Sequence, residues 1–328
     1  MSLRKITSFV SAAVLAAWLA PVEARAQTYP ERPVSLVVGQ AAGGTSDIFA
    51  RFFAEALSHK FGRIIVENTP GAGGTIAATR VARAAPDGYT FLFGSSGINA
   101  IAYSLYKDLA YKPDDFVPVA HVADTTIVIA VKKELGVKTM AEFIALAKAK
   151  PDELTMGHTG NGQTTHLVCV LLQQTAGIKL RMVPFRGGGE SVNALLAGVT
   201  DGACNGTPDL AQNVLSGSVV GLGVGSAERI ELIPDTPSAI DLGLPGMVAP
   251  VWLTIFAPKG TPKAIVDKLN AALQEAMNDP SLAKRLASVG SSLAPKSGRT
   301  VEAAEKLVAS DIRRWAEVMQ KAGVGKSQ

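Results

Sequence analysis

The sequence lacks a strong excess of charge of either sign, and beyond residue 20 it lacks any apolar run long enough to span a bilayer. Its 32 basic and 28 acidic residues give a formal net charge of +4. This near-neutrality argues against nucleic acid or an anionic membrane surface as the main partner. The short apolar runs argue against direct membrane insertion. Low-complexity tails and internal repeats are also missing.

Motifs for chemistry are equally scarce. His158 and His166 have no clustered thiolates or carboxylates beside them, so we expect neither a metal site nor a cofactor. Ser95 and Ser96 lie outside any G-x-S-x-G elbow, which argues against a serine hydrolase. The glycine-rich run 221–226 lacks the final glycine of a dinucleotide fingerprint.

The start of the chain has the pattern of an export signal. Arg4 and Lys5 precede an apolar run over 6–20, and a small-x-small triplet follows at 24–26. We therefore expect a signal peptide over residues 1–26, a mature chain that starts at Gln27, and export to the periplasm by the general secretory route. Removal of the three basic residues and one acidic residue in this segment leaves a charge of +2.

Two cysteines remain after this removal, Cys169 and Cys204. An oxidising compartment permits a disulfide between them. Cys169 lies in a helix-like apolar run and Cys204 near the end of an expected strand, however, and free cysteine is among the most often buried residues. We expect two buried thiols rather than a bridge.

Apolar runs alternate with helical patterns along the chain, and short glycine and proline clusters separate them. The expected strands span 34–38, 64–67, 90–93, 118–122, 127–131, 154–157, 180–184, 202–205 and 219–224. The expected helices span 47–60, 75–83, 139–150, 164–176, 190–197, 262–278, 281–287 and 301–322. This alternation predicts an α/β protein with a mostly parallel sheet in each half.

A glycine-rich loop over 39–47 joins the first expected strand to the first expected helix. Its glycines let the main chain approach a guest closely, and Thr45, Ser46 or Asp47 can cap the helix. The first-turn N–H groups and the helix dipole then suit a carboxylate or phosphate. The alternative is an ordinary connection with a good cap.

A second loop of this kind, over 157–166, lies in the other half of the chain. Ligands of open α/β sheets bind beyond the carboxyl ends of the strands. Two such loops therefore predict a clamshell in which unpaired N–H groups at two facing helix starts hold one anion.

Several segments, in this order, resemble the periplasmic substrate-binding proteins of tripartite tricarboxylate transporters, the Bug family. Besides the opening Tyr29-Pro30-x-Arg32-Pro33 and the loop that ends at Asp47, they are VENTPGAGG at 66–74, PDGYT at 86–90, PFRGG at 184–188, PDTP at 234–237 and APKGTP at 257–262. The resemblance covers nearly the whole mature chain.

The resemblance implies a type II periplasmic-binding-protein fold: two lobes, each with a mostly parallel central sheet flanked by helices, and a ligand cleft between them. Domain 1 would hold residues 28–127 and 252–328, and domain 2 residues 128–251. The ligand contacts that it implies are Ala42, Gly43, Gly44, Thr45, Ser46, Asp47, Ser95 and Ser96 in domain 1, and Thr159, Gly160, Gln163, Thr164, His166, Phe185 and Asn205 in domain 2.

The chain departs from the family pattern at Gly39-Gln40, where Pro-Phe is usual. This change predicts a more open and polar wall, and with Phe93 and Phe185 a site for a larger or aromatic carboxylate. We interpret Asp47 as an N-terminal cap that shapes the loop. The alternative is that Asp47 meets the ammonium group of an amino-acid ligand.

Three functions follow from these patterns. The first is a monomeric receptor that captures a small carboxylate (a di- or tricarboxylate, an aromatic carboxylate or an amino acid) and delivers it to the membrane subunits of a transporter. The second is a receptor of the same fold that feeds a two-component sensor. The third and weakest is a secreted serine hydrolase.

Overall fold

The structure is a computed structural model that describes residues 29–58 and 60–321 of the 328. The expected signal peptide and its cleavage site lie outside the described residues. The described residues 29–31 belong to a separate unit, in which the peptide bond between Tyr29 and Pro30 is cis. The described residues from Arg32 onward belong to a second unit, which contains the helices and strands given below.

A six-stranded sheet forms the centre of what we call lobe 1, in the order β11-β4-β10-β3-β1-β2. Its strands are β1 (Val34–Val38), β2 (Ile64–Asn68), β3 (Thr90–Ser95), β4 (Phe116–Thr125), β10 (Val251–Pro258) and β11 (Ser292–Leu293). β2, β1 and β3 are parallel, whereas β10 is antiparallel to both β3 and β4.

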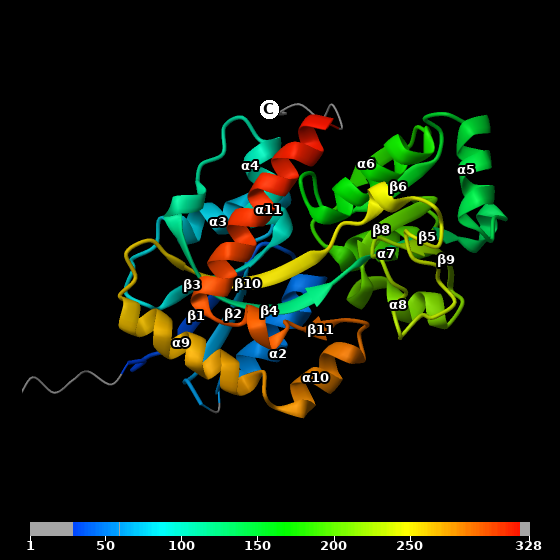
Figure 1. Ribbon diagram of the computed structural model, residues 1–328. Coiled ribbons are helices and arrows are strands. Elements are labelled where there is room, and N and C mark those ends of the chain that lie inside the picture. The colour runs from blue at the N-terminus through cyan, green and yellow to red at the C-terminus, as the bar shows by residue number, and fades with distance from the viewer. Residues whose placement is uncertain (1–28, 59, 322–328) are drawn as a thin grey trace, which may run out of the picture. The chain divides into compact units, whose positions relative to one another are not determined.

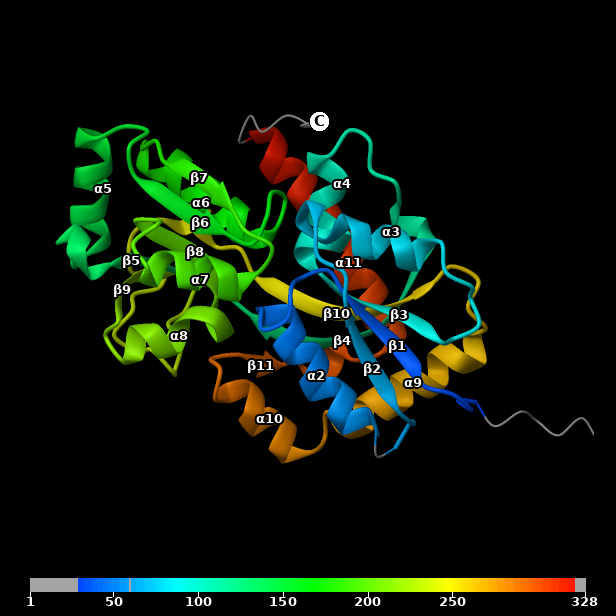
Figure 2. The same cartoon turned by 180° about the vertical axis from the view of Figure 1, so that it is seen from behind.

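Helices cover both faces of this sheet (Figures 1 and 2). They are α2 (Thr45–Ser58), α3 (Thr75–Ala82), α4 (Ala102–Leu105), α9 (Lys263–Ala276), α10 (Pro280–Ala287) and α11 (Val301–Lys321). In both views α3, α4 and α11 lie on one face and α2, α9 and α10 on the other. The chain after β3 enters a π-helical turn, Gly97–Ile101, before α4.

A five-stranded sheet forms the centre of what we call lobe 2, in the order β7-β6-β8-β5-β9. Its strands are β5 (Ile127–Lys132), β6 (Thr155–His158), β7 (Arg181–Pro184), β8 (Gly202–Gly206) and β9 (Val219–Val224). Its helices are α5 (Met140–Ala149), α6 (Thr164–Ala176), α7 (Gly188–Leu196) and α8 (Thr207–Leu215).

The period-two pattern of β5 explains how lobe 2 is built around it. Ile127, Ile129 and Val131 join one buried apolar cluster, which includes residues of α5 and α6. Val128 and Ala130 join another cluster, which includes residues of α7 and α8. Because successive strand residues point to opposite faces, a fully apolar strand requires helices on both sides.

The chain crosses between the lobes twice. β4 of lobe 1 and β5 of lobe 2 are separated by a single residue, Thr126, and the segment 225–250 returns from β9 to β10. Trp252 at the start of β10 is fixed to α11, because its Nε1 and that of Trp315 donate to Asp311 Oδ2 at 2.7 and 3.0 Å. These two crossings form the hinge region.

The structure confirms the α/β class with two sheet-and-helix lobes, but the sheets are mixed rather than mostly parallel. β10 runs antiparallel to both of its neighbours in lobe 1, and β5 does so in lobe 2. The strand that follows each crossing, β5 or β10, thus runs against the parallel part of its sheet. Among the described helices none has the length and apolar character needed to span a bilayer.

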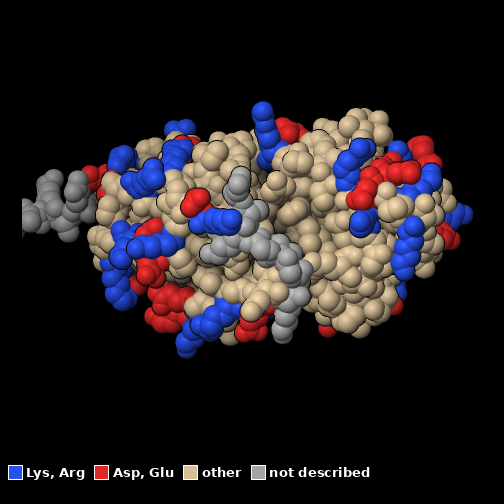
Figure 3. All heavy atoms as spheres, turned by 90° about the horizontal axis from the view of Figure 1, so that it is seen from above, with Lys and Arg blue, Asp and Glu red and all other residues tan. Residues whose placement is uncertain are grey.

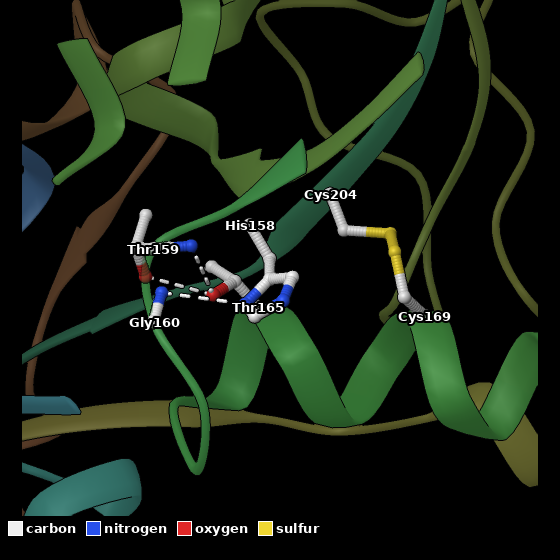
Figure 4. The surroundings of a disulfide bond; sticks show 6 residues. All are labelled: His158, Thr159, Gly160, Thr165, Cys169 and Cys204. Atoms are coloured by element: carbon white, nitrogen blue, oxygen red, sulfur yellow. Dashed lines mark hydrogen bonds between the residues drawn. A yellow bond between two sulfur atoms is a disulfide. The ribbon is translucent and has the colours of Figure 1, made fainter. Parts of the chain in front are cut away.

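The expectation of two free thiols is wrong. Cys169 on α6 and Cys204 on β8 form a disulfide, with a Cα–Cα distance of 6.1 Å (Figure 4). Both residues are fully buried, as expected. Their 35-residue separation in sequence gave no sign that α6 packs directly on β8.

Candidate ligand-binding cleft

The predicted loop of lobe 2 meets lobe 1, and residues of both predicted loops line one cavity. The hydroxyl groups of Ser96 in lobe 1 and Thr164 in lobe 2 are hydrogen-bonded at 3.0 Å. Tyr106 donates across the cleft to the carbonyl oxygen of Asn161 at 2.7 Å, and Gln163 Nε2 donates to the carbonyl oxygen of Gly73. The lobes are therefore in contact at their facing edges, as in a closed clamshell.

A cavity of about 20 Å³ lies between the lobes. Its lining comes from both lobes, including the strand ends beside the two crossings, namely Gln40, Thr45, Ser46, Ser95, Thr125, Ile127, Thr159, Gln163, Thr164, Thr165, Gly206, Asp209, Val251 and Leu253. Hydroxyl and amide side chains dominate this lining, which contains no lysine or arginine. The volume suffices for about one water molecule.

A second cavity of about 440 Å³ lies at the rim and shares Thr159 with the first. Phe185, Arg186 and Tyr106 contribute side chains to it, together with the glycine loop 71–74. The central cavity is polar, whereas the larger cavity at the rim is partly aromatic.

Two N–H groups at and just before the start of α2 are already paired, although we expected unpaired amides there. The Ser46 N–H donates to Gln40 Oε1 at 3.0 Å, and the Gly43 N–H donates to Asp47 Oδ2 at 2.9 Å. Gln40 is buried. It therefore fills the helix start rather than opening the wall as predicted.

Asp47 lies in the first turn of α2, which begins at Thr45, rather than at the N-cap. Its carboxylate accepts hydrogen bonds from Gly43, Arg51 and Asn68. Burial alone would raise the pKa of Asp47, but these hydrogen bonds and the Arg51 charge together lower it. Asp47 thus shapes the loop as expected, with both carboxylate oxygens engaged within lobe 1.

The start of α6 is the more open donor site. The Thr165 hydroxyl accepts from the Thr159 N–H at 3.1 Å and is hydrogen-bonded to the Thr159 hydroxyl at 2.7 Å (Figure 4). First-turn N–H groups have no partner within a helix. Within the described part of the chain, the N–H groups of Thr164 and Thr165 have no acceptor elsewhere either. The predicted unpaired amides are present here.

Two neighbouring histidines, with rings tilted by 37° to each other, support this loop. The rings of His158 and His166 lie 4.7 Å apart, and their Nδ1 atoms accept from the N–H groups of Gly160 and Gly162. Burial, with a smaller effect of His166, lowers the pKa of His158 to about 3, and burial lowers that of His166. Both rings are therefore neutral at physiological pH, and they add no positive charge for an anion.

The carboxyl group of Asp209 enters the cleft from lobe 2, from the first turn of α8. Thr45 Oγ1 donates to its Oδ2 across the cleft at 2.9 Å. Burial raises the pKa of Asp209 to about 7, and the Thr45 hydroxyl and the N–H groups of Thr45 and Gly206 oppose this rise. We did not predict Asp209 from the sequence, because an anion site requires hydrogen-bond donors and a carboxylate is an acceptor.

The structure brings some of the predicted contacts together and leaves others outside. Those that line the central cavity are Thr45, Ser46, Ser95, Thr159, Gln163 and Thr164. Gly160 and Phe185 line the rim cavity. Gly44, Ser96 and Asn205 are buried beside the cleft, whereas Ala42 and Gly43 are exposed on the loop. Asp47 and His166 act within their own lobes.

The central cavity also has lining residues that were not predicted. The strand ends beside the crossings contribute Thr125, Ile127, Val251 and Leu253, which only the fold brings to this place. Thr165 lay inside the predicted loop but was not selected. Phe93, suggested as part of a wider wall, packs in the core against Phe53 instead.

Charged side chains lie mainly outside the cleft. Basic and acidic residues are interspersed at both ends of the face in Figure 3, and the visible part of its middle is largely uncharged. Among the described residues, no group of three or more His, Cys, Asp or Glu side chains is arranged to hold a metal ion.

Comparison with known proteins identifies the family. Residues 49–324 match the model of the tripartite tricarboxylate transporter family receptor. Protein BugT of Bordetella pertussis is 33% identical over 318 residues, which cover 96% of this chain and 95% of BugT.

Solved structures agree over most of the chain. The periplasmic binding protein BugD superposes with a TM-score of 0.88 at 36% identity, covering 91% of this chain and all of BugD. MatC from Rhodopseudomonas palustris, solved with bound malate, gives 0.85 at 36% identity, covering 88% of this chain and 99% of MatC.

Proposed function

The chain belongs to the tripartite tricarboxylate transporter receptor family, and from this premise we propose that it captures a small carboxylate between its lobes and delivers it to a transporter in the membrane. The observation that carries the proposal is the start of α6, where N–H groups without acceptors and a cluster of hydroxyl groups face the start of α2.

This donor set suits an anion that must be released again. Neutral N–H and O–H groups and the positive end of a helix dipole stabilise a carboxylate without a buried opposite charge. A buried ion pair, by contrast, has a large desolvation cost. The absence of lysine and arginine from the lining of the central cavity is consistent with reversible capture.

The size of the cavity requires movement before a ligand can enter. A space of about 20 Å³ is too small for a dicarboxylate, so the lobes must open about the two crossings, and the ligand must then replace part of the existing contacts. Contacts from both lobes to the ligand would favour the closed form, and the transporter would recognise this closed form as the occupied state.

The neighbours support the ligand class. MatC was solved with malate, a dicarboxylate, and BugD is a periplasmic binding protein. The family and these neighbours are receptors and binding proteins rather than enzymes, so the serine hydrolase is set aside. For this chain, the carboxylate ligand, the transporter subunits as partners and the monomeric state are parts of the proposal.

The lobe boundaries are also proposed. Residues 28–127 with 252–328 would move as one body and residues 128–251 as the other. This division is supported by the starts of β5 at Ile127 and β10 at Val251, which lie at the two crossings. Export to the periplasm by the general secretory route is proposed from the first 26 residues.

A ligand screen tests the proposed function. Purified protein lacking residues 1–26 is heated with a panel of aliphatic, aromatic and amino carboxylates, and the compound recovered afterwards is identified by mass spectrometry. We expect a rise in the unfolding temperature with at least one carboxylate, which is recovered unchanged. Consumption of the compound, or no response to any carboxylate, would contradict the proposal.

A further inference from the structure

Asp209 has one carboxylate oxygen without a partner. Oδ2 accepts from the Thr45 hydroxyl, but Oδ1 is inaccessible to solvent and has no hydrogen-bond partner among the described residues. A buried acceptor left unsatisfied costs roughly 1–3 kcal/mol, and more when charged. A residue kept in this state within a binding cleft requires an explanation.

A second acceptor nearby is in the same condition. Asn205 Nδ2 donates to the carbonyl oxygen of Gly188 at 3.1 Å, which fixes the orientation of its amide, and Asn205 Oδ1 has no partner in the described chain. A Cβ atom on Gly188 would lie 2.1 Å from the Asp209 carboxylate. Asn205 and Asp209 therefore flank Gly188 with two oxygen atoms that lack donors.

No charged side chain in the described part of the chain pairs with Asp209. The groups that act on its pKa are burial, the Thr45 hydroxyl and the N–H groups of Thr45 and Gly206. The charges on neighbouring elements are engaged elsewhere: Asp47 pairs with Arg51 on α2, and Glu190 on α7 accepts from the Arg186 N–H. His158 and His166, on β6 and α6, are neutral.

From these contacts we infer that Asp209 is a specificity-determining residue, which favours carboxylate ligands that carry a hydrogen-bond donor, an ammonium or a hydroxyl group, near their carboxyl group. The inference rests on the proposed function, because it assigns a role within the same cleft. The ligand carboxylate meets the donors at the start of α6, and the ligand donor meets Asp209 Oδ1.

The same geometry disfavours a ligand that places an acceptor there. A second carboxylate beside Asp209 would add like-charge repulsion, so one of the two groups would have to bind a proton. A plain methylene would leave Oδ1 unsatisfied. Sites that hydrogen-bond a polar group reject analogues without it more strongly than apolar pockets reject a missing methylene.

A matched ligand series tests the inference. Succinate, L-malate and L-aspartate share one carbon skeleton and differ in a hydrogen, a hydroxyl and an ammonium group, and glutarate, 2-hydroxyglutarate and L-glutamate repeat the comparison one carbon longer. Calorimetric titration at pH 8 is expected to give the wild-type protein at least about tenfold tighter binding of a donor-bearing member than of the plain diacid.

The variant Asp209→Asn is expected to reduce this ratio at least about fivefold, since the amide weakens the attraction to a donor. The control Asp267→Asn removes an exposed carboxylate on α9, paired with Lys263, and should leave the ratio unchanged. A purely structural role for Asp209 would weaken all ligands equally, and this result would overturn the inference.

A measurement on the wild-type protein alone tests the inference even if Asp209→Asn misfolds. In the wild-type protein the preference for an ammonium ligand over the plain diacid should increase from pH 6 to pH 8, because Asp209 loses its proton in this interval. A ratio that does not change with pH would overturn the inference while carboxylate binding stands. If no member of either series binds, the proposed function fails for these carboxylates, and the inference fails with it.

Discussion

Asp47 and Asp209 show how two aspartates in equivalent positions differ in chemistry. Each lies in the first turn of a helix at the cleft, where the dipole favours a negative charge. Burial would raise the pKa of Asp47, but its three hydrogen-bond donors in lobe 1 together lower it. Burial also raises the pKa of Asp209, and the Thr45 hydroxyl opposes this rise only in part. One carboxylate holds a loop together, and the other remains available to a guest.

Replacing Asp209 is expected to stabilise the protein at high pH. The folded-state pKa of about 7 lies above the unfolded value, so the free energy of unfolding falls as pH rises from about 4 to about 7 and stays low above it. Asp209→Asn should therefore increase the free energy of unfolding at pH 8 by about 1–3 kcal/mol and change it little at pH 5. The unfolding temperature at the two pH values measures this difference. Equal effects at both pH values would show that Asp209 is solvated.

Replacing Asp47 is expected to have the opposite effect. Its lowered pKa means that its contribution is present above the unfolded pKa and is lost as pH falls through the folded value. Asp47→Asn should cost about 1–3 kcal/mol in denaturant unfolding at pH 7, and less at pH 3.

The exposed pair of Lys263 and Asp267 provides the control for Asp47. Asp267→Asn should change the free energy of unfolding by less than about 0.5 kcal/mol. A loss for Asp47→Asn no larger than this would contradict the role of Asp47 in holding the loop.

Capping chemistry and the resemblance to the Bug family together predicted most donors of the cleft. Thr45 and Ser46 follow from capping chemistry at the first loop, whereas Thr159 and Thr164 were implied by the resemblance; all four line the central cavity. Asp209 did not follow, because its role depends on the distance across the cleft and on burial. The Gln40 side chain was interpreted as opening the wall, since sequence does not show that it folds back onto Ser46.

At the scale of elements, α6 links the binding loop to the core of lobe 2. Its first turn presents Thr164 and Thr165 to the cleft, and one turn further on the disulfide fixes Cys169 to β8. A covalent link this close to the helix start restrains the donor site relative to the core of lobe 2.

The double variant Cys169→Ser/Cys204→Ser is expected to lose about 3–4 kcal/mol in denaturant unfolding, from the chain-entropy estimate for a closed loop of this size. Reductant should lower the wild-type stability to the same level and leave the double variant unchanged. Two thiols titratable in denaturant without reductant, together with no response to reductant, would contradict the disulfide.

Most elements followed from periodicity, but α4, α8, β10 and β11 did not. The ranges of β1, β9 and α6 agree with the structure to the residue, because strong apolar patterns end at glycine or polar residues. β10 is an apolar run bounded by prolines, and it was not selected among the strands. Its antiparallel position between β3 and β4 depends on the second crossing, which local patterns do not show.

At the scale of the whole molecule, close approach of the lobes depends on glycine. A Cβ atom on Gly73 of lobe 1 would lie 2.2 Å from the carbonyl oxygen of Asn161 in lobe 2. Backbone atoms cannot move aside as a flexible side chain can. Gly73 therefore permits the closed arrangement, in which Gln163 also bonds to its carbonyl oxygen.

Gly73→Ala is expected to weaken carboxylate binding at least about tenfold in calorimetry, since it opposes closure. Gly177→Ala is the matched control, because Gly177 has nearly the same φ (62° against 61°) and no atom within 4 Å of its added Cβ. Both variants should lose about 1 kcal/mol of stability from the left-handed backbone. Equal affinities for the two variants would show that closure does not accompany binding.

The central claim is that the cleft recognises the carboxylate group itself. Calorimetric titration of the best carboxylate from the screen, beside its neutral amide, tests this claim most directly. We predict one bound carboxylate per chain and at least about hundredfold weaker binding of the amide, because the amide carries no charge for the α6 helix start. Equal binding of the two compounds would contradict the account.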